Sequence, residues 1–346
     1  MFIKCKKYWL ILVIFGLGLI TLAYCLYMPQ KYYLSVAAIM KNEKPYLKEW
    51  IEYHLLQGVE HFYLCDNDST DGTKEYLAPY IQKGIITYIE MSGADKQLVC
   101  YSQIAQQYKN DTTWLALIDL DEFLVPLKAK NMPQFLKEFD DAAQVSLYWM
   151  NYGDNYAFNR QQGLVTEFFT AHGYALNHTV KSIIRPEKVI DFNDKWSNHW
   201  VKVAGKSVNE NHQPVSYMLG FNISGHKARV NHYIIKSFAE FLFKRSRGHP
   251  DQSQVDYRYY FFHNQNDVLH DTSMERFLPE LKKRMKNSPL ADVPLPQIEG
   301  LPTGFEQFYF SPEEVSAILG TDITTPMSYD EVKSRYYNRH PQYNKK

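Results

Sequence analysis

Residues 32–126 alternate short, β-rich apolar segments with longer segments of helical periodicity, and this alternation constrains the fold more than any other feature. The predicted strands are 32–40, 59–66, 85–91 and 113–118, and the predicted helices between them are 46–58, 74–84 and 96–109. In the first helix, Leu47, Trp50 and Ile51 recur at three- and four-residue steps. Strands that alternate with helices in this way predict an α/β fold with a mostly parallel sheet covered by helices on both faces.

Acidic residues follow two of these strands directly. They are Asp66, Asp68 and Asp71 after the second strand, and Asp119, Asp121 and Glu122 after the fourth. In an open parallel sheet, ligands bind outside the carboxyl ends of the strands. We therefore expect both groups of carboxylates at the rim of a ligand-binding site.

The Asp119-x-Asp121 pair offers oxygen ligands to a divalent cation. A turn at the end of the strand would direct both carboxylates to one ion, and hard oxygen ligands suit Mn²⁺ or Mg²⁺. Such an ion usually completes its coordination with phosphate oxygens of a substrate. The alternative is that both residues simply cap a turn or helix, as Asp often does. An aspartyl phosphatase is disfavoured, because Glu122 and Phe123 replace the small residues that its phosphate loop needs.

The N-terminal segment differs from the rest of the chain. Residues 8–30 carry no charged side chain, and their apolar part is long enough to cross a bilayer as a helix of about 20 residues. The run is longer than the core of a cleaved signal peptide and lacks a small-x-small cleavage site. Lys4, Lys6 and Lys7 precede it, whereas Lys31 alone follows closely. The positive-inside rule then predicts a single-pass type II membrane protein.

Three regions follow from this organisation. Residues 1–30 form a cytoplasmic tip and transmembrane anchor, 31–250 the α/β domain, and 251–346 a helical C-terminal extension packed on that domain. Lys plus Arg equals Asp plus Glu, at 38 each, so the chain lacks the basic field that nucleic-acid binding needs.

Beyond the N-terminal segment the cysteines are Cys65 and Cys100. They are either two buried free thiols or one disulfide in an oxidising lumen. The scarcity of cysteine favours the free thiols.

Four segments, in order, resemble glycosyltransferase family 92 and its bacterial relatives in the broader family 2 clan. They are residues 37–73, 114–126, 181–189 and 231–248. The resemblance implies a GT-A fold, which is Rossmann-like, and inverting transfer of a sugar from a nucleotide donor to a glycan acceptor. It also implies a metal ion, Mn²⁺ or Mg²⁺, held on the Asp-x-Asp motif. UDP-galactose is the default donor among UDP-sugars.

The resemblance also implies roles for single residues. Asp66 or Asp68 would contact the base of the nucleotide, Asp119 would lie near ribose and metal, and Asp121 would coordinate the metal. His232 would complete the metal site, with His226 as the second choice. Lys181 and Arg185 would lie along the donor or acceptor cleft. The last group is Lys244, Arg245 and Arg247, which either counter the donor phosphates or complement a helix C-terminus.

An inverting transfer needs a general base for the acceptor hydroxyl. Asp154 is the first candidate, although its surroundings depart from the family pattern and a turn residue is the alternative; Glu122 and Asp191 are the further candidates. An aromatic wall for an acceptor sugar, or else part of the core, is predicted from Trp196, His199 and Trp200.

A second class of function stays open at this point. A membrane-anchored carbohydrate-binding or scaffolding protein could keep the same shell without turnover. Location depends on the source: a Golgi-type lumen would suit a eukaryotic chain. A bacterial chain would sit in the inner membrane, and its body would have to face the cytoplasm, against the lysine bias, because a periplasm lacks nucleotide sugars.

Overall fold

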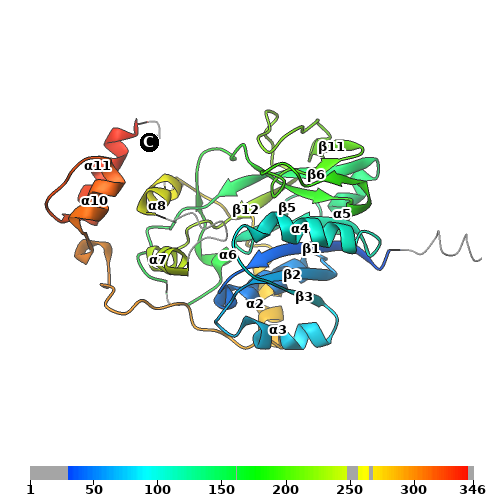
Figure 1. Cartoon of the computed structure of the whole chain (residues 1–346), viewed down its shortest axis with the longest axis horizontal. Helices are drawn as coiled ribbons and strands as arrows, with labels where there is room; N and C mark the ends of the chain where they lie inside the picture. The colour runs from blue at the N-terminus through cyan, green and yellow to red at the C-terminus, as the bar shows by residue number, and fades with distance from the viewer. Residues whose placement is uncertain (1–29, 161, 248–255, 265–267, 342–346) are drawn as a thin grey trace, which may run out of the picture. The chain divides into compact units, whose positions relative to one another are not determined.

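The computed structural model describes residues 30–160, 162–247, 256–264 and 268–341 (Figure 1). Tyr32–Lys346 form one compact unit. Apart from Gln30, the predicted membrane anchor at residues 8–30 lies outside the described residues. Within the described ranges, no helix has both the length and the apolar character needed to span a membrane.

The described part of the chain is built around one mixed, nine-stranded sheet. Its order is β3-β2-β1-β4-β8-β6-β12-β5, with β11 beside β6. The strands are β1 (Tyr32–Met40), β2 (His61–Asn67), β3 (Ile86–Met91), β4 (Thr112–Leu117), β5 (Glu122–Pro126), β6 (Ala142–Asn151), β8 (Val180–Ile184), β11 (Lys206–Asn209) and β12 (Ala228–His232).

The first half of the sheet matches the sequence prediction and the second half differs from it. Strands β3, β2, β1 and β4 are parallel to one another. Strand β8 then runs antiparallel to both β4 and β6, and β5 runs antiparallel to β12. Strands β11 and β12 run parallel to β6. The α/β class is confirmed, and the sheet is mixed, with more parallel than antiparallel pairings among its described strands.

Helices α2 (Lys44–Leu56), α3 (Thr73–Gln82) and α4 (Lys96–Gln107) connect the parallel strands (Figure 1). Alternate residues of β1 show that α2 and α4 cover opposite faces of the sheet. Val36 and Ala38 belong to the apolar cluster that contains α2, whereas Ala37 and Ile39 belong to the cluster that contains α4. Because successive strand residues point to opposite faces, the prediction of a sheet covered on both sides is confirmed.

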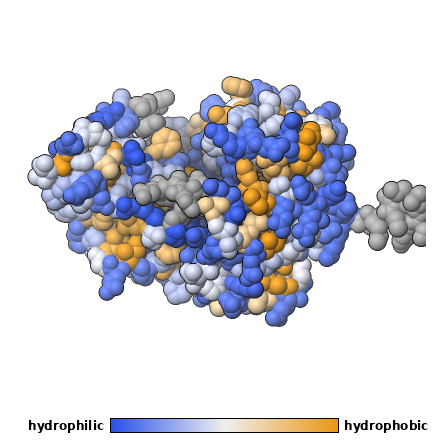
Figure 2. Space-filling model, viewed as in Figure 1, coloured by the Kyte–Doolittle hydropathy of each residue, from blue (hydrophilic) through white to orange (hydrophobic). Residues whose placement is uncertain are grey.

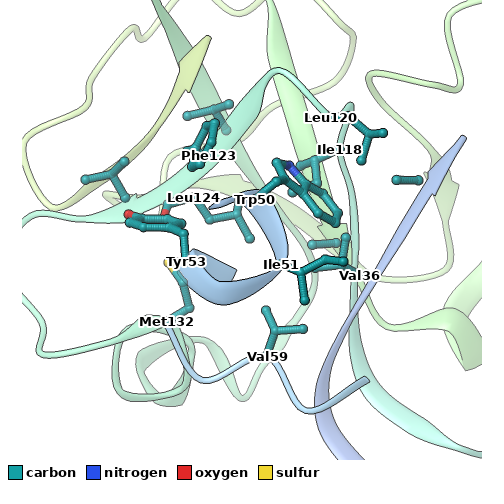
Figure 3. Close-up of a cluster of buried hydrophobic side chains, with 14 of the residues drawn as sticks. Val36, Trp50, Ile51, Tyr53, Val59, Ile118, Leu120, Phe123, Leu124 and Met132 are labelled. Atoms are coloured by element: carbon teal, nitrogen blue, oxygen red, sulfur yellow. The ribbon is translucent and has the colours of Figure 1, made fainter. Parts of the chain in front are cut away.

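Helix α2 fixes the segment that follows β4. Trp50, Ile51 and Tyr53 pack against Ile118, Leu120 and Phe123 in the core (Figure 3). The Trp50 indole N–H donates to the Glu122 carbonyl at 2.9 Å, and the Tyr53 hydroxyl donates to the Leu124 carbonyl at 3.0 Å. These bonds position β5, which is the chain's exit from the region of Asp119 and Asp121.

The C-terminal half contributes helices to two separate cores. Helices α7 (Phe238–Arg247), α8 (Tyr257–His263), α10 (Pro312–Leu319) and α11 (Tyr329–Arg339) share a cluster rich in Phe and Tyr. Helix α9 (Leu278–Asn287) joins the core of α2 instead. The predicted boundary near residue 250 falls in 248–255, outside the described residues.

Short elements complete the described chain. They are α5 (Met132–Leu136), α6 (Val165–Phe168), β7 (Ala171–His172), β9 (Val189–Asp191), β10 (Lys202–Val203), β13 (Leu269–His270), β14 (Tyr309–Phe310) and β15 (Met327–Ser328). The face shown in Figure 2 is mainly hydrophilic, with apolar residues in small groups.

A disulfide joins the end of β2 to α4. Cys65 and Cys100 are both fully buried, 35 residues apart in sequence, and bonded to each other. The sequence analysis left free thiols and a disulfide as alternatives and favoured the thiols. The structure shows the disulfide instead.

Candidate active site

The chain turns at the Asp-x-Asp motif, directly after the buried strand β4. After β4 it turns at Asp119, where the Glu122 amide donates to the Asp119 carbonyl at 3.1 Å and the Asp119 amide donates to Glu122 Oε2 at 2.8 Å. Ile118 and Leu120 are buried in the core beside Trp50 (Figure 3). Asp119 and Asp121 are thereby left to line a cleft at the carboxyl ends of β1 and β4.

The cleft holds about 190 Å³. This volume is below the roughly 300–1,000 Å³ that is usual for a small-molecule site. Its charged lining residues are Lys41, Glu43, Asp119, Asp121, Lys244 and Arg247, and its other polar lining residues include Gln97, Asn198, His199 and His232. Strands β1, β6 and β12, the turn after β4, and helices α4, α7 and α8 all contribute to the lining.

Asp119 is fixed by a buried lysine from β8. Lys181 Nζ lies 2.7 Å from Asp119 Oδ2 and 3.5 Å from Glu122 Oε2, and its side chain is 1% exposed. Burial opposes ionisation of Asp119, but the Lys181 ammonium outweighs it and lowers the pKa of this carboxyl. Burial raises the pKa of Glu122 well above its usual range. The Lys181 ammonium therefore balances the negative charge of Asp119.

Asp121 has two partners within the cleft. Its Oδ1 lies 3.4 Å from His232 Nε2, and its Oδ2 lies 2.9 Å from Lys244 Nζ. Burial disfavours the charged carboxylate, but Lys244 and then His232 reverse that effect and hold the pKa of Asp121 well below its ordinary value. Burial lowers the pKa of His232, so its imidazole is neutral at pH 7 and able to bind a metal ion.

The chemistry of Asp121 and His232 fits a divalent cation, although the protein supplies a partial ligand set. Among the described residues, no group of three or more His, Cys, Asp or Glu side chains is arranged to hold an ion. Mg²⁺ and similar ions commonly take one or two carboxylates and complete their shell with substrate phosphates and water. The Nδ1 atom of His232 is buried without a hydrogen-bond partner in the described structure.

Arg247 closes one side of the cleft. Its guanidinium donates to the Lys41 carbonyl and to the Glu43 carboxylate, which joins the end of α7 to the loop after β1. Other polar atoms of the lining lack partners within the described residues: Trp149 Nε1, Asn198 Oδ1 and Arg247 Nε are buried and unsatisfied. Since buried polar groups normally have partners, these are the atoms that a bound ligand would satisfy.

Comparison with known proteins identifies the family of the chain. The sequence profile of glycosyltransferase family 92 matches residues 30–246. The chain belongs to glycosyltransferase family 92. The resemblance inferred from the four sequence segments is thus confirmed.

Similar proteins cover the chain in part. A glycosyltransferase family 92 protein of Arabidopsis thaliana is 26% identical over 175 residues, which are 45% of this chain and 29% of that protein. One of Ricinus communis is 31% identical over 94 residues, 27% of this chain and 16% of that protein. The chain therefore spans less than a third of the length of these relatives. Among solved structures, TarS of S. aureus matches with 13% identity and a TM-score of 0.34 over 73% of this chain and 43% of TarS.

The structure of this family 92 chain brings together some of the predicted site residues. Asp119, Asp121 and His232 meet in the cleft, and Lys181 contacts Asp119 from beneath it. Lys244 and Arg247 also line the cleft, whereas Arg245 contacts Glu314 at 3.7 Å. His226 lies elsewhere, with its amide bonded to Glu210 at 2.8 Å.

Asp66 and Asp68 lie in a different pocket. Asp66 accepts hydrogen bonds from the Tyr88 hydroxyl and, at 2.8 Å, from the Ser69 amide, and Asp68 accepts one from the Gly93 amide at 2.9 Å. The residues lining this pocket are distinct from those lining the cleft of Asp121. The two groups of strand-end carboxylates therefore line two separate pockets.

Arg185 is placed at the opposite end of β8 from the cleft. Its guanidinium stacks 4.3 Å from the Trp114 ring, near the start of β4, and donates to the Ala142 carbonyl at 3.0 Å. Strands β4 and β8 are antiparallel, so the four residues from Lys181 to Arg185 carry the chain about 13 Å away from Asp119. At this position, Arg185 is not placed to contact a ligand in the cleft directly.

The carboxylates predicted as general base lie outside the cleft lining. Asp154 is 1% exposed and accepts hydrogen bonds from the Tyr260 hydroxyl and, at 2.9 Å, from the Asn264 amide. Glu122 is fully buried, and Asp191 bonds the Asn193 amide at 3.1 Å. The position of Asp154 matches the alternative of a structural residue in a loop.

The aromatic wall of the cleft differs from the predicted one. His199 lines it, but Trp196 and Trp200 do not, and the Trp200 indole donates to Ser207 at 3.0 Å. Trp149 of β6 takes their place, with its ring 5.2 Å from His199 and 4.4 Å from His232.

Sequence reasoning also missed several polar lining residues. They are Lys41, Glu43, Gln97 and Asn198. The first two follow β1 immediately, so the rule that ligands bind at strand carboxyl ends could have found them. Gln97 and Asn198 carry no comparable signal in the sequence.

Proposed function

We propose that this chain is a membrane-anchored, metal-dependent, inverting glycosyltransferase of the GT-A type. It moves a sugar from a nucleotide-sugar donor, with UDP-galactose as the default, to a glycan acceptor. The observation that carries the proposal is the meeting of Asp119, Asp121 and Lys244 in one cleft at the carboxyl end of β4. The parallel order β3-β2-β1-β4 and its loops are the arrangement that a nucleotide-binding sheet uses.

Each cleft residue has a role in this proposal. Asp121 and His232 would hold Mn²⁺ or Mg²⁺, and Asp119, oriented by Lys181, would face the ion and the ribose. Lys244 and Arg247 would bring positive charge to the diphosphate. The bound ion would act as a Lewis acid that stabilises the charge on the departing nucleoside diphosphate.

The proposed location of the enzyme is supported by the sequence and the disulfide. The apolar run at residues 8–30 would anchor a type II membrane protein. The buried Cys65–Cys100 bridge supports an oxidising compartment for the body, such as a Golgi-type lumen in a eukaryote. A bacterial chain would sit in the inner membrane.

A non-catalytic carbohydrate-binding protein is the second candidate. It is favoured by one observation, the absence of Asp154, Glu122 and Asp191 from the cleft lining. Such a protein would bind a donor or glycan without turnover.

One experiment separates these functions. The full chain would be tested for binding and hydrolysis of a panel of nucleotide sugars, with Mn²⁺ or with EDTA, beside Asp121→Asn and the control Asp141→Asn. Asp141 pairs with Lys206 at 2.6 Å outside the cleft lining. We expect binding and turnover of one UDP-sugar that EDTA and Asp121→Asn abolish and Asp141→Asn preserves. Binding without turnover would favour the non-catalytic alternative, and a folded protein that binds none of the donors would refute the proposal.

A further inference from the structure

Lys244 forms an ion pair with Asp121, the carboxylate that the proposed function assigns to the metal ion. Its ammonium lies 2.9 Å from Asp121 Oδ2 and also donates to the Ile234 carbonyl at 2.9 Å. The other oxygen of Asp121 faces His232 Nε2 at 3.4 Å. Lys244 comes from the last helix of the family match, 123 residues away in sequence, and its side chain is 13% exposed. In the structure described here, the chain's own cation thus neutralises Asp121.

Among the described residues that line the cleft, positive and negative side chains are equal in number, and Lys181 adds a further positive charge behind Asp119. Glu43, Asp119 and Asp121 supply three negative charges, and Lys41, Lys244 and Arg247 supply three positive ones.

Two ligands of opposite charge would be coupled in this cleft. A divalent cation alone would add two positive charges, and a diphosphate ester alone would add two negative ones. Because charges are weakly screened in a partly buried cleft, each ligand favours binding of the other. The two ligands together leave the net charge of the cleft unchanged.

We propose that Lys244 is a placeholder cation, which leaves Asp121 when a divalent ion binds there and then pairs with the diphosphate of the donor. The inference rests on the proposed function and adds to it a coupling between metal and nucleotide. Lys suits this exchange because its ammonium is a compact charge on a flexible four-carbon stem. Arg247, one turn further along α7, lines the same cleft and offers the diphosphate a second cation.

The exchange has a thermodynamic consequence. Without nucleotide, a metal ion must compete with the Lys244 ammonium for Asp121, so it binds weakly. With a diphosphate present, the displaced ammonium gains a new partner, and the ion binds more tightly. The reverse effect of the ion on nucleotide affinity must be equal, because coupling between two bound ligands is reciprocal.

The variant Lys244→Met tests the proposal, with Arg245→Met as the matched control. Both variants remove one positive charge from the same turn of α7, but Arg245 contacts Glu314 at 3.7 Å and the Tyr257 ring at 4.3 Å and lies outside the cleft lining. Binding of Mn²⁺ to the full-length protein would be measured from the EPR signal of the free ion, with and without UDP. Binding of UDP would be measured by calorimetry, with and without Mn²⁺. Circular dichroism would establish that each variant is folded, and Lys244→Gln would replace Lys244→Met if it is not.

We expect Lys244→Met to bind Mn²⁺ alone about 10-fold more tightly than the wild type. The factor by which UDP increases the affinity for Mn²⁺ should be about 10-fold smaller in the variant than in the wild type. Arg245→Met should match the wild type in both respects. Unchanged or weaker binding of Mn²⁺ by Lys244→Met would overturn the inference. If the wild type and both variants bind UDP but none binds Mn²⁺, the inference is overturned while the nucleotide site stands. If none binds UDP with or without metal, the proposed function fails as well.

Discussion

Lys181 holds Asp119 through an ion pair of 2.7 Å, formed beneath the cleft by a side chain that is 1% exposed. The pair joins β8, in the middle of the sheet, to the turn that carries both acidic residues of the motif. It therefore links the stability of the sheet to the geometry of the candidate active site.

Lys181→Met should destabilise the protein by about 3 kcal/mol, because it leaves a partly buried carboxylate without its counter-charge. The pKa of Asp119, which Lys181 lowers, should rise in the variant. Urea unfolding would measure the loss of free energy. Lys206→Met is the control, since Lys206 pairs with Asp141 at 2.6 Å but both side chains are more than 60% exposed. The control should cost less than about 0.5 kcal/mol, and equal losses for the two variants would contradict a special role for Lys181.

Asp154→Asn should affect stability rather than turnover. The Asp154 carboxylate is buried and accepts hydrogen bonds from Tyr260 of α8 and from Asn264 directly after it, and the change replaces one acceptor oxygen of this buried network with an NH2 donor. We expect a loss of about 1–3 kcal/mol in the free energy of unfolding and a turnover rate close to that of the wild type. Steady-state kinetics and thermal unfolding would be measured on the same preparation. If the turnover rate instead fell by about 100-fold or more while stability stayed unchanged, Asp154 would be identified as the base.

The sequence predicted the elements whose signals are local. The strands at 32–40 and 85–91 match β1 and β3 closely, because apolar β-branched runs between turn residues have few alternative structures. The turn at Asp119 was less visible, since Phe123, Leu124 and Val125 are as apolar as the strand before them. The turn is specified by the Glu122 side chain, which accepts a hydrogen bond from the Asp119 amide, and by Trp50 of α2, whose indole donates to the Glu122 carbonyl.

Positions that depend on distant contacts were predicted less well. His232 was placed in the site by its motif, but the contact of Lys244 with Asp121 spans 123 residues and has no local pattern. Arg185 was misjudged as a cleft residue because the antiparallel direction of β8, which carries it away from Asp119, cannot be derived from strand periodicity. Asp154 depends in the same way on helix α8, more than 100 residues later.

Removal of the disulfide should weaken both the fold and the site. The bridge closes a loop of 35 residues, so Cys65→Ala with Cys100→Ala should cost about 4 kcal/mol in the free energy of unfolding. Helix α4 carries Gln97 and Tyr101, which donate to Asp119 at 2.6 and 3.2 Å, and a loosened α4 should weaken donor binding. Urea unfolding of the oxidised, reduced and double-alanine proteins would measure the first effect. Equal stability of the oxidised and reduced proteins would contradict the prediction.

The stability of the protein should fall on mild acidification, in part because of His54. His54 lies on α2, and its imidazole is fully buried against β5. Its Nδ1 contacts the Trp50 carbonyl at 2.8 Å, and its Nε2 accepts a hydrogen bond from the Leu124 amide at 3.3 Å. Burial lowers its pKa from 6.5 to about 3. Between these two values the unfolded chain binds a proton that the folded chain does not, so stability decreases as the pH falls through 6.5.

For one such histidine, the loss between pH 7 and pH 5.5 amounts to about 1.3 kcal/mol. His54→Gln keeps a donor and an acceptor at this position but does not titrate. We therefore expect the variant to be less stable than the wild type at pH 7, and this difference to shrink by about 1.3 kcal/mol at pH 5.5. Urea unfolding of both proteins at the two pH values measures the change directly. A difference that stays constant with pH would show that His54 is protonated equally in the folded and unfolded chains, which its two hydrogen bonds and its burial argue against.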